Sequence, residues 1–314
     1  MRQPLLVIVG PTAVGKTKVA VELALRLDGE VISADSMQVY RGMDIGTAKP
    51  TLAERRGIPH HLIDLVDPGT PFSVADFQRL AGAAVAAVAE RGRLPMLVGG
   101  SGLYIESMTR AYELPDGETD WALRDALAAE AERDGDAALH ARLAALDPVA
   151  AARIHPNDRR RTIRALEVTI RTGKPFSHAS HRRREPEYDL LQFGLTAPRA
   201  VLYERIDRRV DAMIAAGLVD ETRRLLAAGY GDALTARQAI GYKELLPFIN
   251  GDASLADCVA ALKQATRRYA KRQLTWFRRD DRIIWVEVGE SIELEAVVEE
   301  ICKSVEGFWH RGLK

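Results

Sequence analysis

The stretch VIVGPTAVGKTKVAVELA, residues 7–24, decides the fold class of this chain. It continues an apolar run that begins at Leu5 and has the length of a buried strand, and the pair Gly10-Pro11 ends this run. From Lys16 the pattern becomes helical, because apolar residues recur on one helical face. They are Val19, Ala20, Leu23, Ala24 and Leu27. The sequence therefore predicts a strand, a tight loop and a helix in direct succession.

The segment GPTAVGKT between this strand and this helix fits the phosphate-loop pattern GxxxxGK[ST]. Its glycines allow successive backbone N–H groups to point inward, and the helix N-terminus adds positive potential. Lys16 supplies a charge for the terminal phosphates, and the hydroxyl of Thr17 is suited to bind Mg²⁺. The loop predicts a diphosphate or triphosphate ligand without identifying the rest of it. A dinucleotide site is disfavoured, because GxGxxG does not occur.

Strands and helices alternate along the chain, which is typical of a parallel α/β sheet. We expect an α/β core like that of the P-loop NTPases, a parallel sheet flanked by helices, formed by residues 1–115 and 198–314. Residues 116–197 are predicted to form an inserted, mostly helical domain. Helices are predicted over 73–91 and from Gly102 onward. The predicted strands cover 30–36, 60–66, 95–100, 188–196 and 282–288.

Charge is balanced over the whole chain but not along it. The sequence has 44 Lys plus Arg and 44 Asp plus Glu, so its formal net charge is zero. Residues 153–184 nevertheless carry ten Lys or Arg against two acids, and residues 263–282 carry eight against two. Such runs form either a solvated face or a surface for RNA. The nine acids between residues 111 and 136 are expected to keep one side of the insertion away from RNA.

The cysteine pattern and hydropathy exclude several protein classes. The two cysteines, Cys258 and Cys302, lie far apart and form no CxxC pair, so neither a disulfide framework nor a zinc ribbon is indicated. No apolar stretch reaches membrane-spanning length, and the N-terminal run is too short for a signal peptide. We expect a cytoplasmic protein that has no membrane partner.

A carboxylate is predicted to face the phosphate loop. The strand-like segment VISAD ends in Asp35, and the carboxyl ends of parallel strands line the ligand crevice of such a sheet. The strand PMLVGG ends in glycines, so it does not supply the magnesium-binding Asp of a typical nucleotide hydrolase. The residues alone leave four roles open for Asp35, which are to bind Mg²⁺, to bind a hydroxyl, to act as a general base or to cap the following turn.

Seven segments occur in an order that resembles the tRNA dimethylallyltransferase family, to about Asp281. They are GPTAVGKT, ADSMQVYRGMDIGTAKP, PHHLIDLVDP, GGSGLYI, NDRRRTIRALEV, ARQAIGYKE and KRQLTWFRRD. Members of that family prenylate N6 of an adenosine beside the anticodon, at position 37 of tRNA. The resemblance is to a bacterial-type member, because the zinc finger of the eukaryotic relatives is missing. Ser101 stands where the family usually has Thr, and the hydroxyl is retained.

The resemblance implies dimethylallyl diphosphate as donor, Mg²⁺ as cofactor and N6-isopentenyladenosine as product. Asp35 is then the general base for the adenine amino group, with Thr12 and Lys16 as the other catalytic residues. Thr12 would donate to the oxygen that bridges C1 and phosphorus. The spacing in LYERIDRRVDAMI does not separate Arg205 and Arg208 from the arginine that the family places on the diphosphate. The implied diphosphate site comprises Gly10, Pro11, Thr12, Ala13, Val14, Gly15, Lys16, Thr17 and Arg209, with Thr17 as the metal ligand.

The resemblance also implies contacts with a tRNA anticodon stem-loop, and we expect a monomer. An amide such as that of Gln38 is suited to bind an adenine edge, and the mixture of charge and aromatic residues around Trp276 is suited to RNA. The implied tRNA-binding residues are Asp35, Ser36, Met37, Gln38, Ser101, Arg124, Arg159, Arg160, Arg161, Thr162, Ile163, Arg164, Arg237, Gln238, Gly241, Tyr242, Lys243 and Arg272.

Three other functions use a similar loop. A small-molecule kinase would phosphorylate its substrate with ATP, and residues 153–184 would serve as its arginine-rich lid. An isopentenyltransferase acting on free adenine nucleotides would use the same donor, but the two basic runs favour a macromolecular acceptor. An RNA-binding nucleotide switch would need purine-recognition and switch loops, which the sequence does not reveal.

Overall fold

The computed structural model describes residues 2–110, 119–179, 188–232, 239–289 and 294–309. The chain divides into two compact units, which we describe separately. The first comprises residues 1–109 and 187–314, and the second comprises residues 110–186. No helix within these described ranges combines the length and the apolar character needed to cross a membrane.

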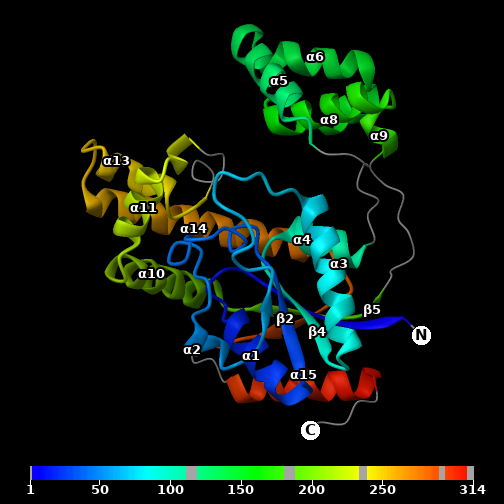
Figure 1. Cartoon of the computed structure of the whole chain (residues 1–314), viewed down its shortest axis with the longest axis vertical. Coiled ribbons are helices and arrows are strands. Elements are labelled where there is room, and N and C mark those ends of the chain that lie inside the picture. Colours follow the sequence, from blue (N-terminus) through cyan, green and yellow to red (C-terminus); the bar gives the residue numbers. More distant parts are fainter. Residues whose placement is uncertain (1, 111–118, 180–187, 233–238, 290–293, 310–314) are drawn as a thin grey trace. The chain divides into compact units, whose positions relative to one another are not determined.

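The first unit is built on a six-stranded sheet with the order β3-β2-β4-β1-β5-β6 (Figure 1). All of its strand pairs are parallel, and the central strand β1 pairs with both β4 and β5. Burial on both faces explains why the middle strands are continuous apolar runs. The strands are β1 (Gln3–Val9), β2 (Gly29–Ala34), β3 (His60–His61), β4 (Leu94–Gly99), β5 (Tyr188–Thr196) and β6 (Ile283–Glu287).

Helices cover both faces of this sheet. On one face, α1 (Lys16–Leu27) lies beside α15 (Leu294–Trp309), and their apolar residues share a core with β1 and β5 (Figure 1). On the other face, α3 (Val74–Glu90) and α4 (Gly102–Thr109) form a second core. A capping box between Ser73 and Asp76 begins α3, because it satisfies N–H groups of the first helical turn.

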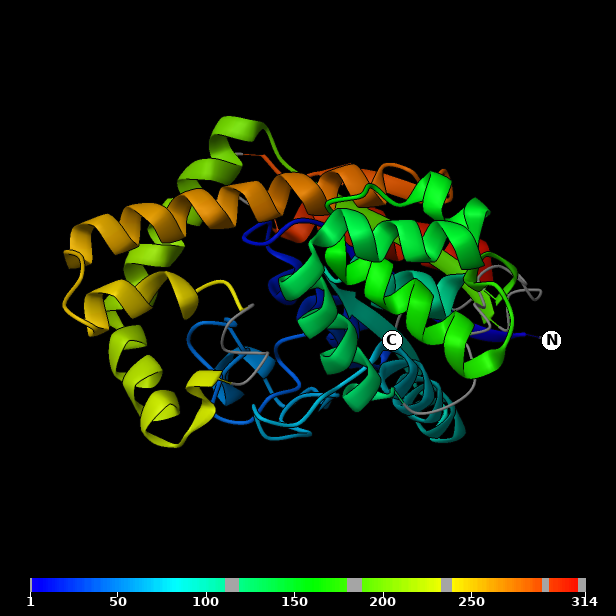
Figure 2. The same ribbon diagram turned by 90° about the horizontal axis from the view of Figure 1, so that it is seen from above.

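A third core lies beyond the carboxyl ends of the strands. Its longest element is α14 (Leu255–Phe277), which Figure 2 shows along its length in orange. The core packs α14 against α10 (Arg199–Ala215) and α11 (Leu218–Ala227), together with residues of the loop after β2. The remaining short elements of this unit are α2 (Leu52–Arg55), η1 (Tyr230–Asp232), η2 (Lys243–Leu245) and α13 (Leu246–Ile249).

The second unit is helical and has its own apolar core. Aspartates begin three of its helices, since the side chains of Asp120, Asp147 and Asp158 each accept a backbone N–H of the first turn. Its helices are α5 (Trp121–Asp134), α6 (Asp136–Leu146), α7 (Pro148–Arg153), α8 (Arg159–Thr172) and α9 (Phe176–Ala179).

Two predicted boundaries were wrong. The insertion was expected at 116–197, but the second unit ends at residue 186, because residues 188–194 of β5 pair with β1 in the sheet of the first unit. The strand expected at 60–66 is only two residues long. Leu62 and Asp64 have φ angles of 63° and 57°, which are incompatible with a continuing strand.

Candidate functional site

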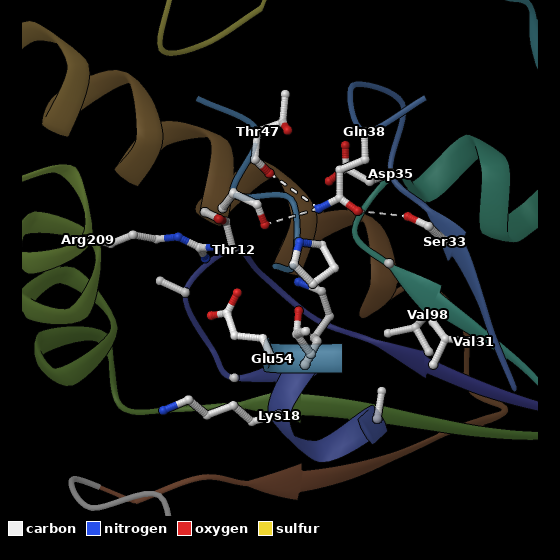
Figure 3. Close-up of a pocket in the computed structure, with 18 of the residues that line it drawn as sticks. Thr12, Lys18, Val31, Ser33, Asp35, Gln38, Thr47, Glu54, Val98 and Arg209 are labelled. Atoms are coloured by element: carbon white, nitrogen blue, oxygen red, sulfur yellow. Dashed lines mark hydrogen bonds between the residues drawn. The ribbon is translucent and has the colours of Figure 1, made fainter. Parts of the chain in front are cut away.

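A cavity of about 770 Å³ lies where the phosphate loop meets the ends of β2 and β4. In Figure 3, Arg209 and Thr12 lie on one side of this cavity, and Val31 and Val98 lie on the other. Helices α10 and α14 also contribute to its wall. The lining includes Thr12, Ala13, Gly15, Lys16, Thr17, Lys18, Ser33, Asp35, Gln38, Thr47, Glu54, His60, Arg205, Arg208, Arg209, Tyr269 and Gln273.

The phosphate loop has the geometry that its sequence predicts. Gly15 precedes the first turn of α1 with a φ of 106°, a backbone conformation that side-chain-bearing residues rarely adopt. No side chain caps this helix, so its first N–H groups stay directed toward the cavity end of the loop. Nζ of Lys16 donates to the carbonyl oxygens of Gly10 and Pro11 at 2.9 and 2.8 Å. The loop therefore presents backbone donors and a cation to one volume.

The charged form of the Lys16 amine is disfavoured in this position. The pKa of Lys16 is lowered to about 7, chiefly because its amine is buried and to a smaller extent because Arg209 is near. The carboxylate of Asp35 opposes both effects by attracting the charged form. Bringing a polyanion into the cavity would stabilise the ammonium form, so the site is arranged for a ligand with several negative charges.

The three arginines of α10 have different environments. Arg205 donates to the carbonyl oxygen of Gly289, and Arg208 lies 3.5 Å from Glu204 on an exposed part of the helix. Arg209 lies on the cavity wall, where burial lowers its pKa and the charges of Asp35 and Glu54 raise it. The structure thus gives Arg209 the strongest electrostatic link to the site, whereas spacing alone left the three equivalent.

Asp35 lies directly after β2 on the cavity wall, as predicted. Its Oδ1 accepts the N–H of Met37 at 2.9 Å, which fixes the turn after the strand. Ser36, the next residue, is fixed by the turn that follows the neighbouring strand β4, because Oγ of Ser101 in that turn accepts the N–H of Ser36 at 2.9 Å. Ser36, Ser101 and Asp35 are therefore brought together at one edge of the sheet.

The predicted role of Gln38 in binding adenine competes with contacts inside the protein. Its Oε1 accepts the hydroxyl of Ser33 at 3.0 Å, and its Nε2 donates to the carbonyl oxygens of Thr47 and Ala48 at 3.3 and 3.4 Å (Figure 3). In this structure the amide of Gln38 holds the loop that follows β2. Met37 packs against the third core.

The cavity lining includes polar residues that the sequence did not single out, among them Tyr269, Gln273 and Glu54. Tyr269 and Gln273 lie one turn apart on α14 and line the cavity, and Glu54 of α2 also lines it. Tyr269, Gln273 and Phe277 are four residues apart, so they lie on one face of the helix, and this spacing can be read from the sequence. That signal was hidden by the basic and aromatic residues around it.

The predicted tRNA contacts of the second unit fall into two groups. Glu167 is fully buried and accepts hydrogen bonds from Arg124 and Arg164 at 2.8 and 2.7 Å, so these two arginines hold the interior of the unit. The rest line the first turns of α8. Arg159 is paired with Asp136, Arg161 lies 3.5 Å from Asp158, Arg160 is exposed, and Ile163 packs against the core of this unit.

Two of the predicted tRNA-binding residues are buried in this structure. Thr162 is 1% exposed and its hydroxyl donates to the carbonyl oxygen of Asp158, while Tyr242 is 2% exposed and its hydroxyl donates to Glu221. Both side chains are therefore occupied inside the protein, and that of Tyr242 packs in the third core. Gly241 donates its N–H to Glu244, which also lies 3.6 Å from Lys243. Arg272 is exposed above the ring of Tyr269, and Arg237 and Gln238 lie outside the described residues.

The oxygen atoms that line the cavity suit a hard cation that is coordinated partly by the protein and partly by the phosphates of a bound substrate. Within the described ranges, no group of three or more His, Cys, Asp or Glu is placed to bind a metal. The cavity does hold the hydroxyl of Thr17 and the carboxylates of Asp35 and Glu54. Magnesium takes oxygen ligands and often combines one or two protein groups with substrate phosphates. This donor set fits Mg²⁺ bound together with a diphosphate.

Comparison with known proteins identifies the family. A family model described as IPP transferase matches residues 38–280, and so covers most of the chain after the phosphate loop. The chain belongs to this family. It is 53% identical over 304 residues to the tRNA dimethylallyltransferase of Desulforudis audaxviator, with 96% of this chain and 98% of the relative covered. The Bacillus subtilis relative of the same name is 48% identical, with 98% of each chain covered.

Solved structures agree with this IPP transferase assignment. The full-length tRNA isopentenylpyrophosphate transferase from Bacillus halodurans aligns with a TM-score of 0.73 and 49% identity, covering 98% of this chain and 97% of that one. A eukaryotic dimethylallyltransferase described as acting on tRNA aligns with a TM-score of 0.83 and 29% identity, covering 99% and 81%. The predicted P-loop-like α/β fold is confirmed by these neighbours and by the parallel sheet.

Proposed function

We propose that the protein transfers the dimethylallyl group of dimethylallyl diphosphate to N6 of adenosine 37, beside the anticodon of a tRNA. The products are N6-isopentenyladenosine and diphosphate. Family membership and the names of the relatives support this transferase activity. The observation that supports the proposed reaction is that a phosphate loop and the carboxylate of Asp35, at the end of a strand, line the same cavity.

The cation-rich side of the cavity suits departure of diphosphate. Breaking the bond between C1 and the bridging oxygen leaves a negative charge on the leaving group and an electron-poor allylic carbon. Lys16 and Arg209 lie on the same cavity wall as the loop amides, where they would stabilise this charge as it develops. The hydroxyl of Thr12 lies in the same part of the cavity and would donate to the bridging oxygen.

Magnesium would bind to the diphosphate and to the hydroxyl of Thr17. When bound there, it would supply further positive charge to the leaving group. Glu54 and Asp35 offer carboxylates within the same cavity. We assign the metal to Thr17 and leave Asp35 for the acceptor, because Met37 already orients the Asp35 carboxylate toward the turn after β2.

The acceptor amine needs help to become a nucleophile, because its lone pair is delocalised into the adenine ring. A carboxylate hydrogen-bonded to N6–H can take up one proton as the new N–C bond forms. Asp35 is the carboxylate at the end of the strand next to β4, and Ser36 and Ser101 fix the turn around it. The adenosine must leave the base stack to reach such a pocket.

A labelling experiment tests this function against the alternatives. The protein is incubated with radiolabelled dimethylallyl diphosphate and magnesium, with either bulk tRNA or AMP, and the labelled nucleoside is identified after digestion. Label in N6-isopentenyladenosine from tRNA supports the proposal. Label in AMP alone would instead indicate the sister activity on free nucleotides, and ATP consumption without any label would indicate a kinase.

A further inference from the structure

Two side chains of α14, Tyr269 and Gln273, lie between the two loops that carry the proposed chemistry. They are one helical turn apart, and both line the cavity. The side chain of Gln273 is only 6% exposed. Its amide must therefore find its hydrogen-bond partners inside the protein.

Both ends of the Gln273 amide have such partners. Oε1 accepts the backbone N–H of Thr12 at 2.8 Å, and Nε2 donates to the carbonyl oxygen of Gly100 at 3.0 Å. Thr12 belongs to the phosphate loop after β1, and Gly100 belongs to the turn after β4. An amide can accept and donate at the same time, whereas an ionised carboxylate of the same length can only accept.

The turn after β4 is shaped for this contact. A Cβ atom built on Gly100 would lie 2.1 Å from Nε2 of Gln273, which is closer than real contacts allow. The backbone of this turn can approach the amide only because residue 100 has no side chain. Gly100 and Gln273 therefore fit as a pair.

Tyr269 extends the connection to the turn that carries the proposed base. Its hydroxyl interacts with the side chains of Ser101 and Gln273, which lower the pKa of Tyr269 against the larger effect of burial, which raises it. Oγ of Ser101 in turn accepts the N–H of Ser36, the residue after Asp35. Polar contacts through Gln273, Tyr269 and Ser101 thus connect Thr12, on the donor side, with the turn that begins at Asp35, on the acceptor side.

We propose that Gln273 is a positioning residue that fixes Thr12 of the phosphate loop relative to the turn carrying Asp35. In this role it sets the distance between the allylic carbon of the donor and the amino group of the acceptor. This inference rests on the proposed function. Transfer between two bound substrates is sensitive to such geometry, since a displacement of about 1 Å can cost about 10²-fold in rate.

The kinetic effect of losing Gln273 should therefore appear in kcat more than in donor binding. The amides of residues 13–17 and Lys16 would still hold the diphosphate. Gln273→Met keeps the length of the side chain and removes both hydrogen bonds. We expect kcat for tRNA to fall by about 10- to 100-fold, while KM for dimethylallyl diphosphate changes by less than about threefold.

Two further variants control this measurement. Gln264→Met makes the same substitution at an exposed position of the same helix, and it should leave kcat unchanged. Gln273→Glu keeps an acceptor for Thr12 but places a carboxylate against the Gly100 carbonyl, so it should not rescue kcat. If Gln273→Met does not fold, Tyr269→Phe removes a single hydroxyl of the same connection and should also lower kcat.

A double-mutant cycle separates positioning from stability. If Gln273 acts through Thr12, then Gln273→Met should cost less than half as much, on a logarithmic scale, in a Thr12→Ala background. Full additivity, or a kcat equal to that of the parent protein, overturns the inference. A parent protein that transfers no label to tRNA would instead refute the proposed function.

Discussion

Asp35 illustrates how one residue can serve both structure and chemistry. Its Oδ1 holds the turn through the N–H of Met37, so removing the side chain entirely would disturb the loop as well as the proposed base. Asparagine keeps an acceptor oxygen for this N–H and removes only the basicity. We expect Asp35→Asn to lower the transfer rate by about 10²- to 10⁴-fold, with donor affinity near that of the parent. Single-turnover transfer to tRNA measures the rate, and an unchanged rate would rule out the general-base role.

Lys16 gives the site a dependence on pH that can be measured without RNA. Because burial lowers the pKa of Lys16 to about 7, its amine is mostly neutral at pH 8 and mostly charged at pH 6. A bound diphosphate raises this pKa again. Proton uptake by Lys16 on binding of dimethylallyl diphosphate should therefore rise from about 0.1 at pH 6 to about 0.9 at pH 8.

Calorimetry in two buffers of different ionisation enthalpy measures this uptake. Lys16→Arg stays charged at both pH values and gives the contribution of donor and magnesium alone. Equal uptake by the parent protein at pH 6 and pH 8, after this correction, would contradict the lowered pKa.

Lys16 also affects how folding stability depends on pH. Between pH 7 and the ordinary pKa of lysine, 10.5, the unfolded chain binds more protons than the folded one. Lys16 therefore makes folding stability increase with pH in that window.

At the scale of elements, α11 holds the loop after β2 through one carboxylate. Glu221 is 2% exposed and accepts the N–H groups of Asp44, Ile45 and Gly46 as well as the hydroxyl of Tyr242. Glutamine at this position would turn an NH₂ group toward these donors. We expect Glu221→Gln to lower the free energy of unfolding by about 2 to 4 kcal/mol. Chemical denaturation measures this, and Glu204→Gln on the exposed part of α10 should have no such effect.

The elements were predictable where their signals are local. The strand, loop and helix of residues 5–27 form a continuous pattern, and their geometry agrees with it. Asp35 was placed correctly because parallel strands end at the same edge of a sheet. Gln273 was missed because its partner Thr12 lies 261 residues away, and Glu221 because the backbone N–H groups that it accepts lie at least 175 residues away. Contacts of that separation are set by topology and leave no periodic signal in the sequence.

At the scale of the whole molecule, the net charge of zero does not show which arginines are exposed and which are bound to buried carboxylates. In the second unit, Arg124 and Arg164 are held by the buried carboxylate of Glu167, whereas Arg160 and Arg161 are exposed at the start of α8. Only exposed arginines can displace counterions from RNA. We therefore expect tRNA affinity to fall steeply with salt, and an Arg160→Ala, Arg161→Ala double variant to reduce the slope by about one to two.

Binding titrations over a range of potassium chloride concentrations measure this slope. Arg133→Ala is a matched control, because Arg133 is also exposed but donates two hydrogen bonds, at 3.1 and 2.8 Å, to the carboxylate of Asp134 on α5. Arg164→Ala is expected to destabilise the second unit, because it leaves Glu167 buried with one partner fewer. Binding that is insensitive to salt, or a double variant with the parent slope, would exclude this face of α8 as the RNA surface.

The position of β1 in the middle of the sheet has a consequence for biosynthesis. This strand ends at Val9, yet its neighbour β5 is complete only at Thr196, after the whole second unit has been translated. At about 5 to 20 residues per second, an apolar strand waits roughly 10 to 40 s on the ribosome for its second partner. The nascent chain is thus exposed to mispairing during this interval, and chaperones that shield β1 would improve the yield of active protein.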